Sequence, residues 1–154
     1  WKNMENKKSL LDLEKIEALI KDSIVCRLGI NQDKTPYIVP LSFGYRDNTL
    51  YFHSGHKGNK LDLLRADPNV CFEFDRVTEV IEAQDPCSWN MMYQSIIGIG
   101  KVAFIDETEN KIKALKTIIS QYSDRQMDIP QVKAKAAVVF QVNIENMTFK
   151  QGPV

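Results

Sequence analysis

Seven consecutive residues, Ser54-Gly55-His56-Lys57-Gly58-Asn59-Lys60, combine two glycines, two lysines and three other polar side chains. They follow the strand-type residues Leu50 to Phe52, helical spacing starts at Leu61, and Pro68 ends that helix. The first N–H groups of a helix have no partner within it, and they carry the positive end of its dipole. Lysines beside such donors make a place for a phosphate group. An ordinary solvated basic turn explains the same composition.

The length of 154 residues is enough for one domain with a proper core, so we expect residues 1–154 to form a single domain. Residues 1–8 are polar, and we expect them to be flexible. Twenty basic and twenty acidic residues cancel, so no overall positive field attracts nucleic acid or an anionic membrane. No apolar run approaches the ~20 residues of a membrane span, and no signal-peptide core is present. We therefore expect no nucleic-acid or membrane partner.

Cys26, Cys71 and Cys87 are odd in number, far apart and without metal-binding spacing. This pattern indicates free thiols in a reducing cytoplasm and not a disulfide framework. The chain has two histidines, His53 and His56, and we expect no metal site built by the protein.

Hydrophobic patterning predicts a mainly β chain with two longer helices and one short helix. Turn signals at 31–34 and 46–48 separate successive strands and indicate antiparallel neighbours. Closure removes exposed sheet edges, so about six or seven such strands favour a closed or nearly closed small barrel. The expected strands are 23–30, 35–45 interrupted by Pro40, the strand from Leu50, 69–75 with 78–83 as continuation or new strand, 88–105 with a bend or bulge at Gly98 and Gly100, 136–143, and 147–150. The first expected helix ends near Asp22, and the second runs through 61–67. The third carries Ile112, Leu115, Ile119 and Tyr122 on its core side.

Three strings carry a family resemblance through their order and spacing: VPLSFGY, then LYFHSGHKGNKLDLLRADPNVCFEFD, then CSWNMMYQSIIGIGKVAFI. They resemble the pyridoxamine 5′-phosphate oxidase-like flavin-binding superfamily, and within it the nitroimidazole-resistance proteins. The resemblance covers nearly all of residues 22–143. It implies a mainly β (α+β) fold, an antiparallel split β-barrel with flanking helices. It also implies a homodimer that holds FMN, with FAD as the alternative, between its subunits.

The resemblance implies a role for each matching position. The strand through residues 39–42 would lie along the isoalloxazine ring, with main-chain groups facing its heteroatoms. One polar pair would lie near the ribityl-phosphate, a second would bind the phosphate, and a third would contact the flavin. The implied cofactor-binding residues are Val39, Pro40, Leu41, Ser42, His53, Ser54, Asn59, Lys60, Gln94 and Ser95.

This chain departs from the oxidase pattern in two ways. Asn59 stands where those oxidases often carry an arginine, so phosphate binding must rely on Lys60 and on loop N–H groups. The chain also lacks the C-terminal arginine and histidine signature of true pyridoxamine-phosphate oxidases, which puts vitamin B6 oxidation in doubt.

His53 has two interpretations. A histidine at a strand end is usually a structural hydrogen-bonding group. In the resembling proteins, a histidine at this position lies beside the flavin, and a pKa near neutrality suits proton delivery to a reduced substrate. His53 is therefore the candidate catalytic residue. Trp89 is either a core residue or a group that could stack on the adenine of FAD, and we expect Cys87 to be a small buried residue.

Two classes of function remain open. The first is a flavin-dependent reductase, similar to the nitroimidazole-resistance proteins, that passes electrons from a small-molecule donor to a small electrophile. The second is a non-catalytic flavin carrier or sensor, and a B6-vitamer oxidase is a weaker third. No GxGxxG motif is present, so a nicotinamide donor would bind transiently in an open cleft.

Overall fold

The computed structural model describes residues 10–153, and the expectation for residues 1–8 lies outside them. Seven antiparallel strands form one sheet in the order β2-β1-β5-β6-β7-β4-β3. The strands are β1 (Cys26–Ile30), β2 (Tyr37–Leu41), β3 (Gly44–Arg46), β4 (Thr49–Ser54), β5 (Asn69–Ile81), β6 (Asn90–Ile105) and β7 (Val138–Gly152). The helices are α1 (Leu10–Asp22), α2 (Asn59–Ala66), the one-turn η1 (Pro86–Ser88), α3 (Thr108–Ser120) and α4 (Gln131–Ala136).

The sheet is curled into an open barrel, which confirms the expected split-barrel architecture. Its two edge strands follow each other in the chain, because only Ser42 and Phe43 separate β2 from β3. Three residue steps cover at most about 11 Å, so the two edges must approach each other at this point. The Phe43 N–H donates to Tyr122 Oη at 2.8 Å, and Tyr122 Oη donates to the Ile24 carbonyl at 3.0 Å. Tyr122, just beyond α3, therefore connects the β2–β3 link to the segment that precedes β1.

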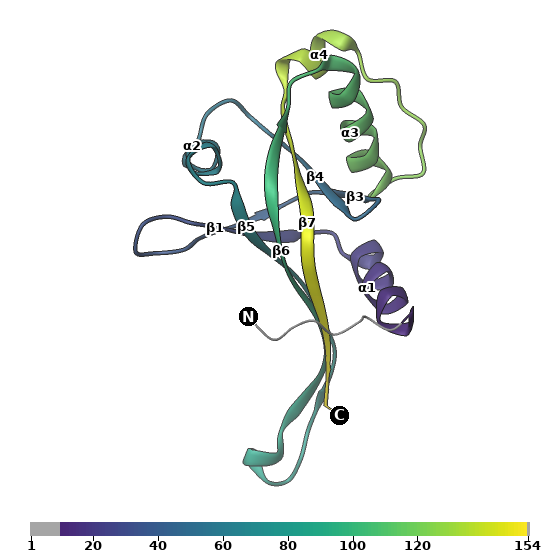
Figure 1. The fold of residues 1–154 in the computed structure, drawn as a ribbon. Coiled ribbons are helices and arrows are strands. Elements are labelled where there is room, and N and C mark those ends of the chain that lie inside the picture. Colours follow the sequence, from purple (N-terminus) through teal and green to yellow (C-terminus); the bar gives the residue numbers. More distant parts are fainter. Residues whose placement is uncertain (1–9, 154) are drawn as a thin grey trace.

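The core lies inside this curl. Large apolar side chains from both halves of the sheet point inward, and α1 and α2 contribute leucines and isoleucines. Phe52 stacks on Phe140 with ring centroids 5.2 Å apart, and Phe43 meets Phe74 edge-on at 4.9 Å. The first pair joins the neighbouring strands β4 and β7, and the second joins the β2–β3 connection to β5. Figure 1 shows α1, α2 and α3 around this body, with α3 and α4 at the end of the molecule opposite the C-terminus.

Two expectations about turns and glycines are refined. Asp47 and Asn48 both have positive φ, which is the two-residue hairpin turn expected between β3 and β4. A bulge lies between Ile99 and Gly100 in the β6–β7 ladder, as expected. At position 98 a glycine is required for packing and not for a bulge, because a Cβ there would lie 2.0 Å from the Phe72 ring. Gly98 therefore makes room for an aromatic side chain.

Pro40 occupies an edge strand, as its missing N–H predicts, but the expected strand 35–45 is two strands, β2 and β3. The segments 69–75 and 78–83 form one strand, β5, with a bulge between Val77 and Glu79. Likewise, residues 138–143 and 147–150 belong to the single strand β7, whereas Ala136 ends α4. Two further expectations were incomplete: α4 was not expected, and Ala114 and Ile118 are the most buried residues of α3.

The β5–β6 hairpin extends beyond the barrel as an arm that ends in η1 (Figure 1). Large apolar side chains lie exposed along this arm: Val77, Val80, Trp89, Met91, Met92 and Tyr93. Among residues 10–153, no helix is both long and apolar enough to cross a lipid bilayer. Within the same part of the chain, no three His, Cys, Asp or Glu side chains cluster as a metal site would require.

Candidate functional site

The basic loop connects β4 to α2 and holds the predicted phosphate-binding residues together. β4 ends at Ser54, the loop spans residues 55–58, and α2 begins at Asn59 and Lys60. Gly58 caps the helix with φ 136°, a conformation that favours glycine, and no side chain caps the helix there. The N–H groups of the first turn of α2 therefore lack a side-chain cap, which leaves them available to an external acceptor.

Lys60 is the cation of this loop that fits an anion. Its side chain is half-buried, and the loss of hydration lowers the pKa of its ammonium group below the usual value. No ion pair within the described part of the chain includes Lys60. A bound phosphate would supply the missing negative charge.

His53 and Ser54 present their side chains to opposite faces of β4. Leu50 and Phe52 are buried in the core, and alternation places Ser54 on their side and His53 on the other. Ser54 is half-buried, whereas His53 is exposed at the outer face. A ligand at the end of β4 could reach both residues, but one confined to a single face could not.

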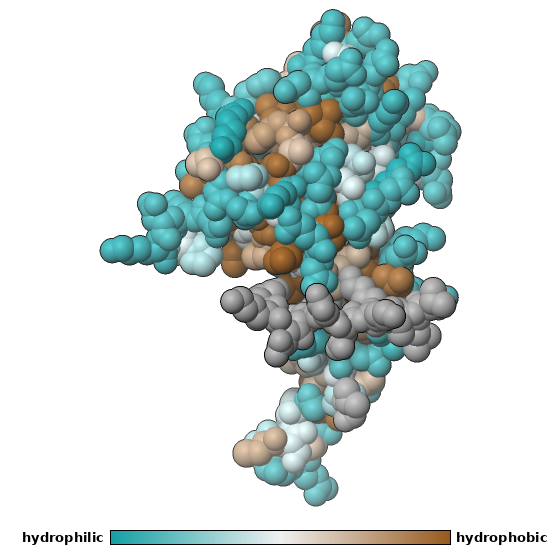
Figure 2. Space-filling model, viewed as in Figure 1, coloured by the Kyte–Doolittle hydropathy of each residue, from teal (hydrophilic) through white to brown (hydrophobic). Residues whose placement is uncertain are grey.

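A cavity of about 360 Å³ adjoins the loop. It lies where β7 begins, since Val138 and Val139 line it and pair with Ser54 and His53 in the sheet. Its basic side chains are His56, Arg65 and Lys111. Figure 2, seen from the same side as Figure 1, shows apolar residues gathered on the body between α2 and α3, where this cavity lies.

Three contacts hold this region in place. A ring nitrogen of His56 bonds the Ala136 carbonyl, and Lys111 Nζ donates to the Ala137 carbonyl at 2.8 Å. The Arg65 guanidinium lies 5.3 Å from the centre of the Phe104 ring. The loop is therefore attached to the end of α4, a connection that the sequence pattern did not reveal.

The predicted ring-binding segment is the edge strand β2. Val39 and Leu41 pack against the core, Pro40 is exposed on the other face, and Ser42 follows the strand and is also exposed. β2 pairs with β1 on one side only, so alternate backbone groups along its free edge lack sheet partners. Those groups suit the main-chain contacts expected for the ring.

Gln94 and Ser95 lie on β6 beside charged residues of β5. Gln94 is opposite Arg76, and Arg76 Nη2 donates to Gln94 Oε1 at 2.6 Å. Arg76 Nη1 also pairs with Asp22 Oδ2 at the end of α1, 2.9 Å away. Ser95 is opposite Asp75 and faces the other side of the sheet. Arg76 was missed in the sequence, because only strand register brings it to Gln94 across 18 positions.

The structure does not bring all the predicted residues together within one chain. Ser54 pairs with Val138 of β7, and Ser95 pairs with Lys150, twelve positions further along the same strand. Twelve positions correspond to roughly 40 Å of extended strand, or slightly less with the bulge. β7 crosses the molecule from α4 to the C-terminal end (Figure 1). The two polar groups therefore lie near opposite ends of β7.

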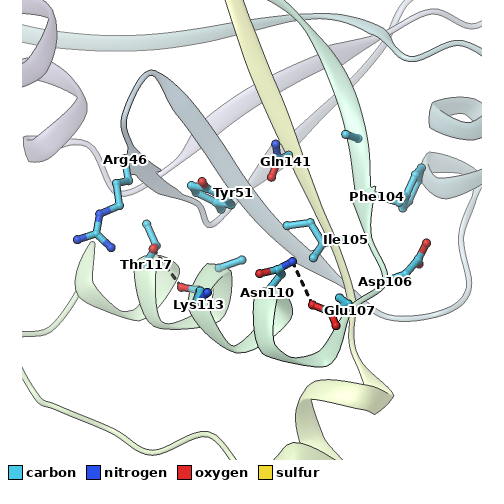
Figure 3. A pocket seen from close by; sticks show the side chains of 12 residues that line it. Arg46, Tyr51, Phe104, Ile105, Asp106, Glu107, Asn110, Lys113, Thr117 and Gln141 are labelled. Carbon is cyan, nitrogen blue, oxygen red and sulfur yellow. Dashed lines mark hydrogen bonds between the residues drawn. The ribbon is translucent and has the colours of Figure 1, made fainter.

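A second cavity, of about 430 Å³, lies between α3 and the outer face of β4, β6 and β7. Figure 3 shows Tyr51 and Gln141 at its centre, with Arg46, Lys113 and Thr117 on one side and Asp106 and Glu107 on the other. None of the predicted flavin-binding residues lines this cavity. It does lie on the His53 side of β4, because Tyr51 precedes His53 by two positions.

Two expectations about side chains near the hairpin arm need correction. Cys87 is exposed in η1 and not buried, and all three cysteines are free thiols. Trp89 is half-exposed, and its Nε1–H donates to the Ala83 carbonyl at 2.9 Å, so it is not a core residue. The indole face remains accessible on the arm.

Comparisons with known proteins agree with the fold. One solved structure, described as that of a 5-nitroimidazole antibiotic resistance protein from Bacteroides thetaiotaomicron, is 33% identical. It aligns over 95% of this chain and 84% of its own, with a TM-score of 0.80. An FAD-binding protein from Mesorhizobium loti shares the fold at 23% identity, with 95% and 96% coverage and a TM-score of 0.67. An FAD and heme binding protein from Mycobacterium smegmatis shares it at 16% identity, with 90% and 70% coverage and a TM-score of 0.81.

A curated relative, an uncharacterized protein of Rhizobium meliloti, is 30% identical over 64 residues, so the match spans 42% of this chain and 42% of that protein. The family model described as pyridoxamine 5′-phosphate oxidase matches residues 12–151, nearly the whole described chain. The expected resemblance is confirmed, and the chain belongs to the pyridoxamine 5′-phosphate oxidase family.

Proposed function

We propose that this chain is a flavin-dependent oxidoreductase that binds FMN between two copies of itself. Family membership supports the choice of cofactor, and Lys60 is the observation that carries it. A half-buried ammonium group at the start of a helix, without an anion among its described neighbours, fits a phosphate monoester. Ser54 and the uncapped N–H groups of α2 would share that phosphate, and Asn59 would add a neutral amide.

The second half of the site would come from a partner copy. Gln94 and Ser95 are separated from the loop by roughly 40 Å of strand, and this separation supports a site in which the loop and β6 come from different copies. A two-fold axis would create two equivalent sites, each with a loop from one copy and a β6 strand from the other. The exposed apolar side chains of the hairpin arm are available for the contact between copies.

His53 would act in the reaction as a proton donor. Bound flavin supplies electron transfer from a reduced donor to an acceptor. An acceptor that takes up electrons becomes basic, and an exposed imidazole at the end of β4 could protonate it. The similarity to the nitroimidazole-resistance protein supports a small electrophile such as a nitroaromatic compound as the acceptor.

A carrier or sensor function is the alternative. The loop, the edge strand and Gln94 would all serve a flavin that is only bound, and then His53 would contact ligand without proton transfer. FAD is the alternative cofactor, and the half-exposed indole of Trp89 could stack on its adenine.

The visible absorption spectrum of the purified chain tests the proposal most simply. A flavin spectrum, bleached by NADH or NADPH without oxygen and restored by a nitroimidazole, is the expected result. A flavin spectrum that no donor bleaches would favour the carrier. A colourless protein that binds neither FMN nor FAD in a titration would exclude both functions.

A further inference from the structure

Arg76 connects the end of α1 to Gln94 through a single guanidinium group. Its Nη2 donates to Gln94 Oε1 at 2.6 Å, and its Nη1 pairs with Asp22 Oδ2 at 2.9 Å. Arg76 and Gln94 are cross-strand neighbours on the core-facing side of β5 and β6, next to the buried residues Phe74 and Ile96. Arg76 Nε is buried without a hydrogen-bond partner. The guanidinium is thus fixed on two sides.

The chemistry of the guanidinium decides how the Gln94 amide must lie. An amide has an oxygen that accepts and an NH₂ group that donates, whereas a guanidinium only donates. Gln94 must therefore turn its oxygen toward Arg76 and its NH₂ group away from it. Within residues 12–153, that NH₂ group donates to no protein acceptor. A half-buried NH₂ group of fixed orientation is suited to an acceptor on a ligand.

We propose that Arg76, held by Asp22, is a positioning residue that makes Gln94 a hydrogen-bond donor toward the flavin of the partner copy. This inference rests on the proposed function. The ligand atoms that Gln94 would bind are acceptors, the ring carbonyls and unprotonated ring nitrogens of the flavin, and not its ring N–H. Without Arg76, the amide could rotate and present either end, and part of its preference for an acceptor would be lost.

A double-mutant cycle separates this role from a purely structural one. Arg76→Met, Gln94→Ala and the double variant are titrated with FMN and with riboflavin, and their unfolding is followed in the absence of flavin. We expect Arg76→Met to lower the affinity for both ligands about 3- to 10-fold, which is the effect of losing one well-oriented hydrogen bond. In the Gln94→Ala background, the same substitution should have no further effect on affinity.

Gln94→Glu gives an independent test that does not depend on Arg76→Met folding well. The carboxylate still accepts from Arg76 but has no N–H to offer a ligand. The Gln94→Glu variant should therefore lose at least as much affinity for both flavins as Gln94→Ala, with no loss of thermal stability. Arg76→Lys, which keeps one donor, should lose less affinity than Arg76→Met.

Lys101→Met is the matched control. Lys101 pairs with Glu145 across the neighbouring strands β6 and β7, with Nζ 3.3 Å from Oε1, and it lies seven positions from Gln94 on the opposite face of β6. It should leave flavin affinity unchanged. Affinity losses from Arg76→Met and Gln94→Ala that add in the double variant, or a Gln94→Glu variant that binds like wild type, would overturn the inference and leave flavin binding intact. A wild-type chain that binds no flavin would instead overturn the proposed function, and this inference with it.

Discussion

Ser54 and Ser95 lie at opposite ends of strand β7: Ser54 is opposite Val138, and Ser95 is opposite Lys150. The family resemblance predicts a flavin contact for both residues, yet one chain separates them by roughly 40 Å of strand. This separation is the physical argument for the proposed site shared by two copies, and the predictions below follow from it and from the residues at each end.

Lys60→Ala should weaken the binding of FMN and have much less effect on the binding of riboflavin, which lacks the phosphate. The loss of one charge-assisted hydrogen bond costs roughly 1.5–3 kcal/mol, or about 10- to 150-fold in dissociation constant. Fluorescence titration of both ligands measures it. Lys116→Ala, on the exposed side of α3, is the control and should change neither affinity. Equal losses for FMN and riboflavin would show that Lys60 acts through the fold.

FMN affinity should fall in alkaline solution because of Lys60. Burial lowers the pKa of its ammonium group below 10.5, so the charge that binds phosphate is lost as the pH rises through that lowered pKa. The same shift disfavours the charged lysine in the folded chain below that pKa, and this penalty disappears as the pH rises toward 10.5. FMN titrations at pH values rising from neutrality toward 10.5 should show weaker FMN binding that riboflavin does not share, since the phosphate is already fully ionised above its second pKa of ~6. Parallel curves for both ligands would contradict this.

His53→Ala should leave a folded, flavin-bearing protein whose turnover of an electrophile falls ~100- to 10,000-fold at saturating FMN, the usual contribution of a positioned general acid. His53→Gln keeps a hydrogen-bonding group but cannot act as a general acid, so it should be similarly slow. Steady-state rates with excess FMN measure both variants. Unchanged turnover at saturating flavin would remove His53 from the mechanism, and activity restored by added FMN would make it only a ligand.

Gly98→Ala should destabilise the chain, because the new Cβ would lie 2.0 Å from the Phe72 ring in the core. Overpacking of this kind costs roughly 1–3 kcal/mol. Urea unfolding without flavin measures the change. Gly55→Ala is the control, since a Cβ there has no atom within 4 Å, and it should change stability by less than about 0.5 kcal/mol. Equal stability of the two variants would mean that Phe72 moves aside easily.

Local patterns in the sequence predicted much of the fold. Alternating polarity identified the strands, Pro40 indicated an edge or a bulge, and the Asp47-Asn48 turn was read correctly because its chemistry is local. Strand continuity was not predictable in the same way. The sequence left open whether β5 continues past residue 75, and it predicted two strands where β7 is one, because pairing with the long strand β6 overrides local signals.

The candidate site was predicted as a set of positions and not as an arrangement. The loop from Ser54 to Lys60 is contiguous, so its residues remain together in the structure. Arg76 could not be recognised as the neighbour of Gln94, since their contact depends on the β5–β6 register and on a bulge between Val77 and Glu79. The distance between Ser54 and Ser95 likewise appears only once the strand order is known.

Mixed dimers test the shared site most directly. Lys60→Ala and Gln94→Ala chains, carrying different tags, are co-expressed, and the dimer that contains both is purified and titrated with FMN. If each site combines the loop of one copy with β6 of the other, one site of the mixed dimer holds both substitutions and the second holds neither. We expect one site of wild-type affinity per mixed dimer, although neither parent dimer has any. A mixed dimer whose two sites both bind as weakly as those of the parents, or a chain that binds flavin as a monomer, would contradict the account.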